Sequence, residues 1–182
     1  TNNSDLAERL RRFRTHGIVR KPERGAWHYE ISELAHHYRM TDIQAALGLS
    51  QLSRIEEFIA ARNNIATLYR EDLADLGIRL PPEAPRGFRH GYHLFAVLLP
   101  NRDAVFQELH RQGIRVQVHY VPVHHHPISS DVVSKRSYPT TEYVFERLIS
   151  LPIFPGMTEQ DQQQVVAALR TVLGDQPRDQ AE

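Results

Sequence analysis

The sequence predicts an α/β protein organised around one long helix. Apolar residues recur at helical spacing from Thr41 to Leu76, and a strand–helix–strand pattern follows between Tyr92 and Tyr120. Hydrophobic residues make up 41% of the 182 positions, which is ordinary for a globular protein and excludes wholesale disorder. We therefore expect a hydrophobic core of normal size.

Charge and cysteine content exclude several classes of protein. The 22 Lys and Arg residues balance 22 Asp and Glu residues, which argues against nucleic-acid binding by bulk electrostatics but leaves room for a local anion site. The absence of Cys excludes disulfides and thiolate metal sites. Because no apolar run approaches a transmembrane span and no signal peptide opens the chain, we expect a cytoplasmic protein without membrane partners.

The first expected element is a short amphipathic helix near the N-terminus. Asn3 can cap its first turn, and Gly17 is suited to follow its end. Three apolar residues follow the cap at helical spacing: Leu6, Leu10 and Phe13. The loop that comes next carries Arg20, Lys21 and Arg24, and it is either a solvated basic loop or a flap that contacts an acidic ligand.

A long helix is expected to begin at Thr41. Thr41 and Gln44 have the spacing of a capping box, and the apolar repeat continues to Leu76, where Gly77 ends it. Some 35 residues of helix would span roughly 50 Å, which exceeds the diameter of a small domain. We expect a straight or bent connecting helix between two bodies, with a coiled coil as the alternative.

A compact α/β unit is expected after the prolines at positions 81, 82 and 85. Its expected elements are strands over 92–99 and 114–120, helices over 102–112, 141–149 and 158–174, and a short extended piece over 151–154. The strand–helix–strand order is either a right-handed crossover unit or part of a split βαβ motif. A polar, frayed tail is expected from Asp175.

Four histidines lie close together in the sequence, at position 119 and at positions 124–126. A metal site is one interpretation, because neutral imidazole is the commonest zinc donor. Neighbouring histidines on an extended chain point to opposite sides, however, and no carboxylate lies within the motif, so we expect no intrinsic metal site. His119 is still a candidate binding residue, since ligands of open sheets gather at strand ends.

A second cluster, His36 to Arg39, lies just before the expected cap at Thr41. A helix N-terminus carries unpaired N–H groups and a positive partial charge, and an Arg beside it can bind phosphate or carboxylate. The cluster is either an anion site or an ordinary loop with an exposed Arg. No nucleophile motif, phosphate-binding loop or dinucleotide fingerprint accompanies it.

Four blocks of the sequence carry a resemblance to a known enzyme family. The main block, over 26–66, reads AWHYEISELAHHYRMTDIQAALGLSQLSRIEEFIAARNNIA, and the others are LAERLRRFRTHGI over 6–18, GIRVQVHYVPVHHHP over 113–127 and SLPIFPGMTEQD over 150–161. In order and spacing they resemble the sugar-nucleotide aminotransferases of the DegT/DnrJ/EryC1/StrS family, which are pyridoxal-phosphate enzymes of fold type I. The W-x-Y-E and TDIQAALGLSQL segments most resemble the pseudaminic-acid pathway transaminases, which use glutamate to aminate a UDP-linked 4-keto-6-deoxy sugar.

The resemblance implies that the chain is the C-terminal part of such an enzyme. It implies a large-domain remnant with the active-site loop and the start of the long helix over 1–57, a small α/β domain over 58–174 and a polar tail over 175–182. In the family the cofactor lysine lies upstream of these blocks, and neither Lys21 nor Lys135 fits its motif. We therefore expect that this chain lacks the Schiff-base lysine and cannot transaminate by itself.

The resemblance also implies which residues bind ligands. Family members are homodimers with shared active sites, and the loop before the long helix has the motif G-Y-N-Y-R-M, whereas residues 35–40 here read A-H-H-Y-R-M. His37 thus replaces the Asn that contacts the cofactor phosphate. The implied cofactor-binding residues are His37 and Arg39. The implied residues for the nucleotide-linked keto sugar are Tyr38, His119, Tyr120, His16 and Tyr29.

Two other functions stay open at this point. One is a non-catalytic relative that keeps the dimer face and the small domain as an interaction or regulatory module. The other, from a different class, is a His-rich metal-binding module. A zinc titration would test the second alternative, and a lysine in the family's Gly-rich block upstream would favour the enzyme over the first.

Overall fold

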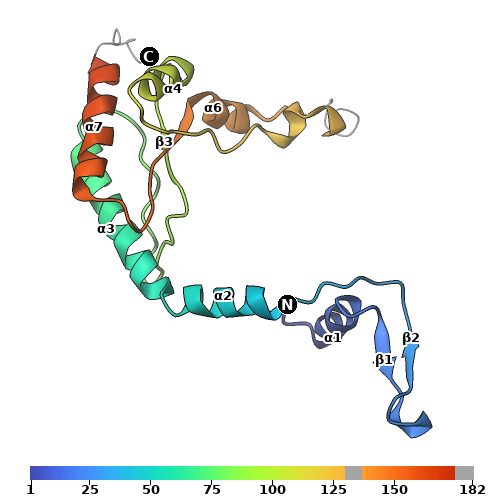
Figure 1. The fold of residues 1–182 in the computed structure, drawn as a ribbon. Helices are drawn as coiled ribbons and strands as arrows, with labels where there is room; N and C mark the ends of the chain where they lie inside the picture. Colours follow the sequence, from blue (N-terminus) through green and yellow to red (C-terminus); the bar gives the residue numbers. More distant parts are fainter. Residues whose placement is uncertain (130–136, 175–182) are drawn as a thin grey trace. The chain divides into compact units, whose positions relative to one another are not determined.

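The computed structural model describes residues 1–129 and 137–174, which fall into two compact units, Thr1–Ser53 and Arg54–Glu182 (Figure 1). We call them the first and the second unit. The predicted division into a large-domain remnant over 1–57 and a small domain over 58–174 stays a prediction. Among the described residues, no helix is both long and apolar enough to cross a membrane.

The first unit contains two helices and a hairpin. Helix α1 spans Ser4–Phe13, strand β1 spans Ile18–Arg20, strand β2 spans Tyr29–Ile31 and helix α2 spans Asp42–Leu52. The Leu6 N–H donates to the Asn3 side chain over 2.9 Å, which confirms the predicted cap of α1. The predicted helix end is wrong: α1 ends at Phe13 with Arg14 as its C-cap, and Gly17, with a φ of +69°, lies three positions further on.

The basic loop is in fact the tip of a hairpin. Strands β1 and β2 pair antiparallel, with Val19 opposite Glu30, and the 3-10 turn η1 (Pro22–Arg24) connects them. Arg24 donates to Glu30 across the hairpin over 2.9 Å. The sequence did not indicate these strands because three residues are too few to show an alternating pattern.

The predicted long helix is two helices rather than one. The capping box at its start is confirmed: the Gln44 N–H donates to Thr41 Oγ1, and the Thr41 N–H donates to the Gln44 side chain. Helix α2 ends at Leu52, however, and helix α3 begins at Ile55. The Ser53 hydroxyl donates to the Ser50 carbonyl, the kind of local bond that competes with helix continuation.

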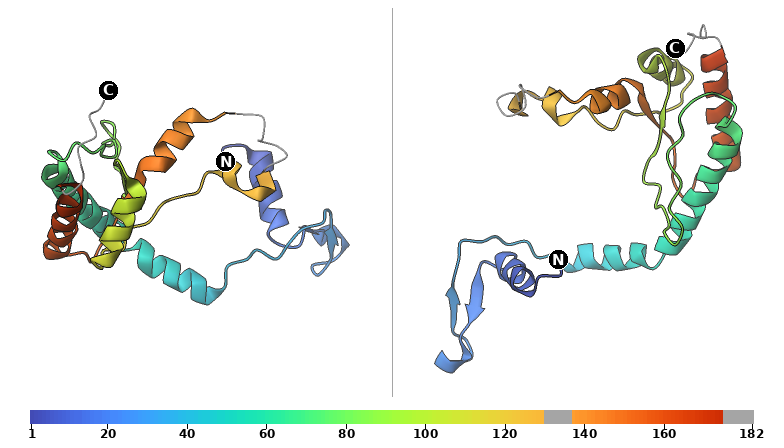
Figure 2. Two further views of the ribbon diagram at one scale, coloured as in Figure 1. Left: turned by 90° about the horizontal axis from the view of Figure 1, so that it is seen from above. Right: turned by 180° about the vertical axis from the view of Figure 1, so that it is seen from behind.

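The second unit holds the hydrophobic core. Its remaining elements are β3 (Phe95–Leu98), α4 (Arg102–Arg111), α6 (Pro139–Arg147), β4 (Leu148–Leu151) and α7 (Glu159–Gly174), together with α3 (Ile55–Leu73). Figure 2 shows α3 and α7 side by side, and α4 also packs against α7. The largest fully buried apolar side chains are Tyr69, Leu73, Phe95, Val97, Leu99, Val105, Leu109, Val116, Ile149 and Leu169.

The sheet of the second unit differs from the predicted one. Strand β3 pairs antiparallel with β4, with Phe95 opposite Leu151, and β4 follows α6 directly. The strand expected over 114–120 is wrong: this segment forms only an isolated bridge between Gln117 and Ser150. Its apolar alternation arises because Val116 is buried in the core while Gln117 is exposed, and burial of one face does not require a continuous ladder.

Candidate functional site

Two segments of the first unit pair and thereby position the residues before α2. The His16 N–H donates to the His36 carbonyl and the Tyr38 N–H donates to the Arg14 carbonyl, both over 2.9 Å. Thr15 and His37 face each other in an isolated antiparallel bridge. These bonds hold the loop of residues 36–38 against the end of α1.

A pocket of about 320 Å³ lies in the first unit next to this pairing. Its lining residues are Glu8, Arg11, Arg12, Thr15, His16, Ile18, Arg20 and Arg39. We call it the arginine pocket, since four guanidinium groups face one carboxylate there. Glu8 lies 3.5 Å from Arg11 and 4.0 Å from Arg12, and Glu33 lies 3.7 Å from Arg12, whereas Arg20 and Arg39 form no ion pair with any described residue. The excess positive charge suits an anion such as phosphate.

Arg39 and His37 contact each other directly. Arg39 Nη2 lies 2.8 Å from His37 Nε2. Because a guanidinium can only donate, Nε2 accepts this bond, and the neutral imidazole then carries its proton on Nδ1. The His16 and His37 rings lie 5.0 Å apart. The structure thus brings His37 and Arg39, the two implied cofactor-binding residues, together with His16, an implied substrate-binding residue. The roles of these residues stay predictions.

The two tyrosines predicted from the same region lie elsewhere on the first unit. The Tyr38 ring stacks on His36 at 4.8 Å and contacts the edge of Phe13. Tyr29 lies on β2 opposite Arg20, with more than half of its surface exposed. Neither tyrosine lines the arginine pocket. Both side chains are more than half exposed.

Sequence reasoning missed two arginines of the pocket, Arg11 and Arg12. Both lie in the last turn of α1. There they favourably face the negative end of the helix dipole, which is their ordinary structural explanation. Arg20, in contrast, was identified as part of a loop able to contact an acidic ligand, and it does line the pocket. A run of Arg next to a predicted helix end was the available signal.

His119 and Tyr120 line a second pocket, also of about 320 Å³, in the second unit. The other lining residues are Pro122, Thr140, Thr141, Val144, Phe145 and Leu148. His119 Nδ1 lies 2.9 Å from the hydroxyl of Ser150, which is buried on β4 and so fixes the imidazole. We call this the His119 pocket. Its apolar wall and two threonine residues suit a ligand that combines hydroxyl groups with a carbon skeleton.

The chain is similar to known aminotransferases over nearly its whole length. An uncharacterized protein of Methanocaldococcus jannaschii is 36% identical over 96% of this chain and 49% of its own length. The structure of Helicobacter pylori PseC, an aminotransferase involved in the biosynthesis of pseudoaminic acid, matches with a TM-score of 0.85 and 26% identity, over 96% of this chain and 47% of that one. A Brucella abortus aminotransferase matches with a TM-score of 0.80 and 30% identity, over 96% and 45%.

These matches agree on fold and on extent. The helices and strands correspond to part of a fold type I aminotransferase, and the chain spans about half the length of the relatives it matches. The profile of the DegT/DnrJ/EryC1/StrS aminotransferase family covers residues 1–170. The chain therefore belongs to the DegT/DnrJ/EryC1/StrS aminotransferase family.

Proposed function

We propose that this chain is the C-terminal part of a pyridoxal-phosphate-dependent enzyme that transfers an amino group from glutamate to a nucleotide-linked 4-keto-6-deoxy sugar. One observation carries the proposal: an arginine-rich pocket lies beside the His37–Arg39 pair in a chain of this aminotransferase family. The likeness to the PseC structure supports a substrate of the pseudaminic-acid type.

The arginine pocket fits the phosphate of the cofactor. Arg39 retains further N–H donors beyond the one that bonds His37, and His37 keeps its Nδ1–H. Arg39 would bind phosphate oxygens, of the cofactor or of the sugar-nucleotide diphosphate, and His37 would add a neutral donor where the family has Asn. Pyridoxal phosphate, when bound, supplies the electron sink for amino-group transfer.

The His119 pocket is the proposed contact for the sugar. Ser150 fixes the His119 ring, so that the imidazole presents its Nε2 in one orientation. The Tyr120 ring lies at 83° to His119, with 72% of its surface exposed. The two residues would position hydroxyl groups of the sugar, while Val144 and Phe145 exclude water from its apolar face.

The Schiff-base lysine is proposed to come from a part of the protein outside this chain. Lys21 precedes the 3-10 turn at the hairpin tip, which is not the buried site that a Schiff-base lysine needs. Lys135 lies outside the described residues. We therefore expect no transamination by the 182-residue chain alone. Activity of this chain with added pyridoxal phosphate and glutamate would contradict this expectation.

The proposed enzyme acts as a homodimer with shared active sites. Helix α2 is consistent with this arrangement, because none of its residues is buried although much of it is apolar. Its exposed large apolar residues are Ile43, Leu47, Leu49 and Leu52. A surface of this kind marks an interface with another part of the protein or with a second subunit.

The role of Arg39 can be tested in the complete protein that contains this chain. Arg39→Ala should raise the KM for the sugar nucleotide or weaken cofactor retention by about tenfold or more, since a charge-assisted phosphate contact contributes about 1.5–3 kcal/mol. Cofactor absorbance after dialysis measures retention, and initial rates measure KM. Arg86→Ala, in the second unit outside both pockets, is the matched control. Equal behaviour of the two variants would remove Arg39 from the site.

A further inference from the structure

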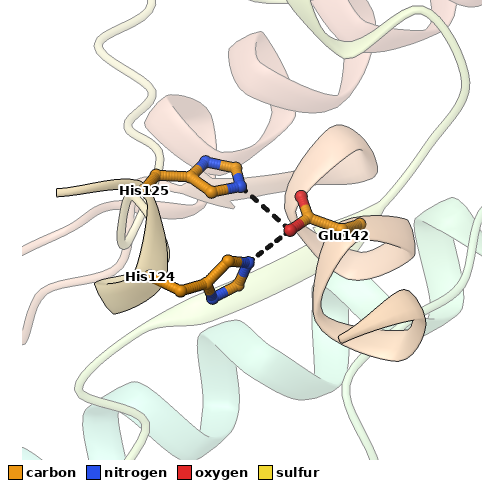
Figure 3. Close-up of side chains that lie close together, drawn as sticks. All are labelled: His124, His125 and Glu142. Carbon is orange, nitrogen blue, oxygen red and sulfur yellow. Dashed lines mark hydrogen bonds and ion pairs between the residues drawn. The ribbon is translucent and has the colours of Figure 1, made fainter. Parts of the chain in front are cut away.

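Two histidines and one carboxylate converge in the second unit, next to the His119 pocket (Figure 3). His125 Nε2 lies 2.9 Å from Glu142 Oε1, and His124 Nε2 contacts the same oxygen. The candidate ligand atoms of the three residues all lie within 4.8 Å of one another. We call this group the His–Glu cluster. None of its members belongs to the lining of either pocket.

The local backbone explains why neighbouring histidines can meet one carboxylate. His124 and His125 belong to a 3-10 turn, η2 (Val123–His125), rather than to an extended segment. With three residues per turn, successive side chains are rotated by about 120°, so that both can face the same neighbouring helix. Glu142 lies in the first turn of that helix, α6. The prediction that these histidines form no metal site is based on an extended chain and on the absence of a carboxylate within the motif. In the structure the histidines lie in a 3-10 turn, and the carboxylate comes from α6.

Aromatic rings hold both imidazoles in place. The Tyr138 ring lies 4.7 Å from His124, and the edge of Phe145 contacts His125 at 5.4 Å. The His124 side chain is 18% exposed, and those of His125 and Glu142 are 35% and 37% exposed. The cluster is therefore ordered by its neighbours and is still accessible from solvent, which are the two conditions for exchange of an ion.

The geometry is close to that of a coordination site. Zn–N bonds of about 2.0–2.1 Å place neighbouring ligands of a tetrahedron about 3.3 Å apart, so an ion requires only a small outward movement of the two imidazoles. Two imidazoles and a carboxylate are a donor set that zinc uses in proteins. In the structure both Nε2 atoms contact one oxygen of Glu142, which leaves its second carboxylate oxygen available to the ion.

We propose that His124, His125 and Glu142 bind a divalent transition-metal ion of the zinc class, with water at the open position. Such an ion connects η2 to α6, two elements separated by the segment between His126 and Tyr138. Pro122 lies two positions before His124 and Thr141 directly precedes Glu142, and both line the His119 pocket. The ion would thus set the width of that pocket, whereas a hard, oxygen-preferring ion such as Mg²⁺ would bind poorly.

Calorimetric titration of the 182-residue chain with Zn²⁺ tests the proposal. We expect one ion per chain at this site and no comparable binding of Mg²⁺. Glu142→Gln and His125→Ala should each weaken Zn²⁺ binding by at least about tenfold, the scale on which metal sites respond to altered support. His126→Ala removes the adjacent histidine outside the cluster, and it should bind as the parent chain does.

Cobalt substitution provides a readout that does not depend on stability. Co²⁺ bound by the parent chain should give the strong visible bands of a four-coordinate ion, and Glu142→Gln should weaken or shift them. Zn²⁺ should also raise the Tm of the parent chain but not that of His125→Ala. Undetectable Zn²⁺ binding, or Zn²⁺ binding and cobalt spectra that the cluster variants leave unchanged, would overturn the proposal.

Discussion

The two units of this chain are held together by different means. In the second unit, apolar side chains from α3, α4, β3, β4 and α7 form a buried core. In the first unit, residues 1–53, no large apolar side chain is buried, and the only buried residue is Gly17. Backbone pairing and exposed ion pairs maintain its fold, and the latter contribute little free energy.

This difference indicates that the two units depend on different sources of stability. Burying a fully exposed Leu or Ile stabilises a protein by about 1.5–3 kcal/mol, and the first unit leaves several such residues, above all those of α2, at the surface. Its stability therefore depends on surfaces that these 53 residues do not supply. The second unit has its own core and needs no such support.

The largest expected effect is the loss of a core aromatic in the second unit. Phe95 is fully buried between Tyr69 and Tyr92, so Phe95→Ala should cost about 3–5 kcal/mol in the free energy of unfolding. Phe88 is 76% exposed, and Phe88→Ala should change stability by less than about 0.5 kcal/mol. Urea denaturation followed by circular dichroism measures both. Similar midpoints for the two variants would show that the second unit is not organised around this core.

A smaller effect is expected at the one buried position of the first unit. A Cβ on Gly17 would lie 2.2 Å from the Glu33 carbonyl oxygen, and its φ of +69° disfavours any L-residue. Gly77 has a similar φ of +66° but no atom within 4 Å of a built Cβ. Gly77→Ala should therefore cost only the conformational term, about 1–2 kcal/mol, and Gly17→Ala should cost more.

Hydrogen exchange distinguishes the two glycine variants. The Ser32 amide donates to the Gly17 carbonyl over 3.0 Å, so Gly17→Ala should accelerate its exchange, whereas Gly77→Ala should leave it unchanged. Exchange of Ser32 at the parent rate in Gly17→Ala would mean that the loop from Gly17 to Glu33 adapts without loss. In that case the first unit is more plastic than its close backbone contacts indicate.

The smallest effect is a pH dependence within the second unit. A hydrogen bond from Arg170 of α7 lowers the pKa of Asp75, just beyond α3, below its ordinary value. Because the folded-state pKa is depressed, this stabilisation is complete above the unfolded pKa of about 4 and is lost as the pH falls through the lower folded value. Asp75→Asn should thus lower the Tm slightly at neutral pH and flatten its decline in acid. Glu71→Gln, a residue of α3 without an ion pair among the described residues, should do neither.

Local signals in the sequence predicted the parts of the fold that depend on neighbouring residues. Asn3 caps α1 and Thr41 caps α2 because capping bonds span only three positions. The break at Ser53 escaped detection, since a two-residue turn leaves the apolar repeat intact on both sides. The pairing of β3 with β4 joins positions fifty or more residues apart, and periodicity carries no information on which strands pair.

The candidate sites show the same limit. His37 and Arg39 are two positions apart, and their contact could be anticipated from the motif before α2. Glu142 could not be assigned in this way, because it meets His124 and His125 through a 3-10 turn that only the folded chain defines. A sequence shows which residues could bind or react, but not which residues from distant positions lie beside them in the fold.

The confinement of the core to the second unit has a consequence for calorimetry. The heat-capacity increment of unfolding arises mainly from apolar surface that becomes exposed, and among the described residues nearly all buried apolar side chains lie after Arg54. The unfolding endotherm measured by calorimetry therefore reports the second unit and is almost insensitive to changes in the arginine pocket. Substitutions of Arg39 or His37 will leave the main endotherm in place whether or not they unfold the first unit, so the integrity of that unit in such variants is measured by hydrogen exchange instead.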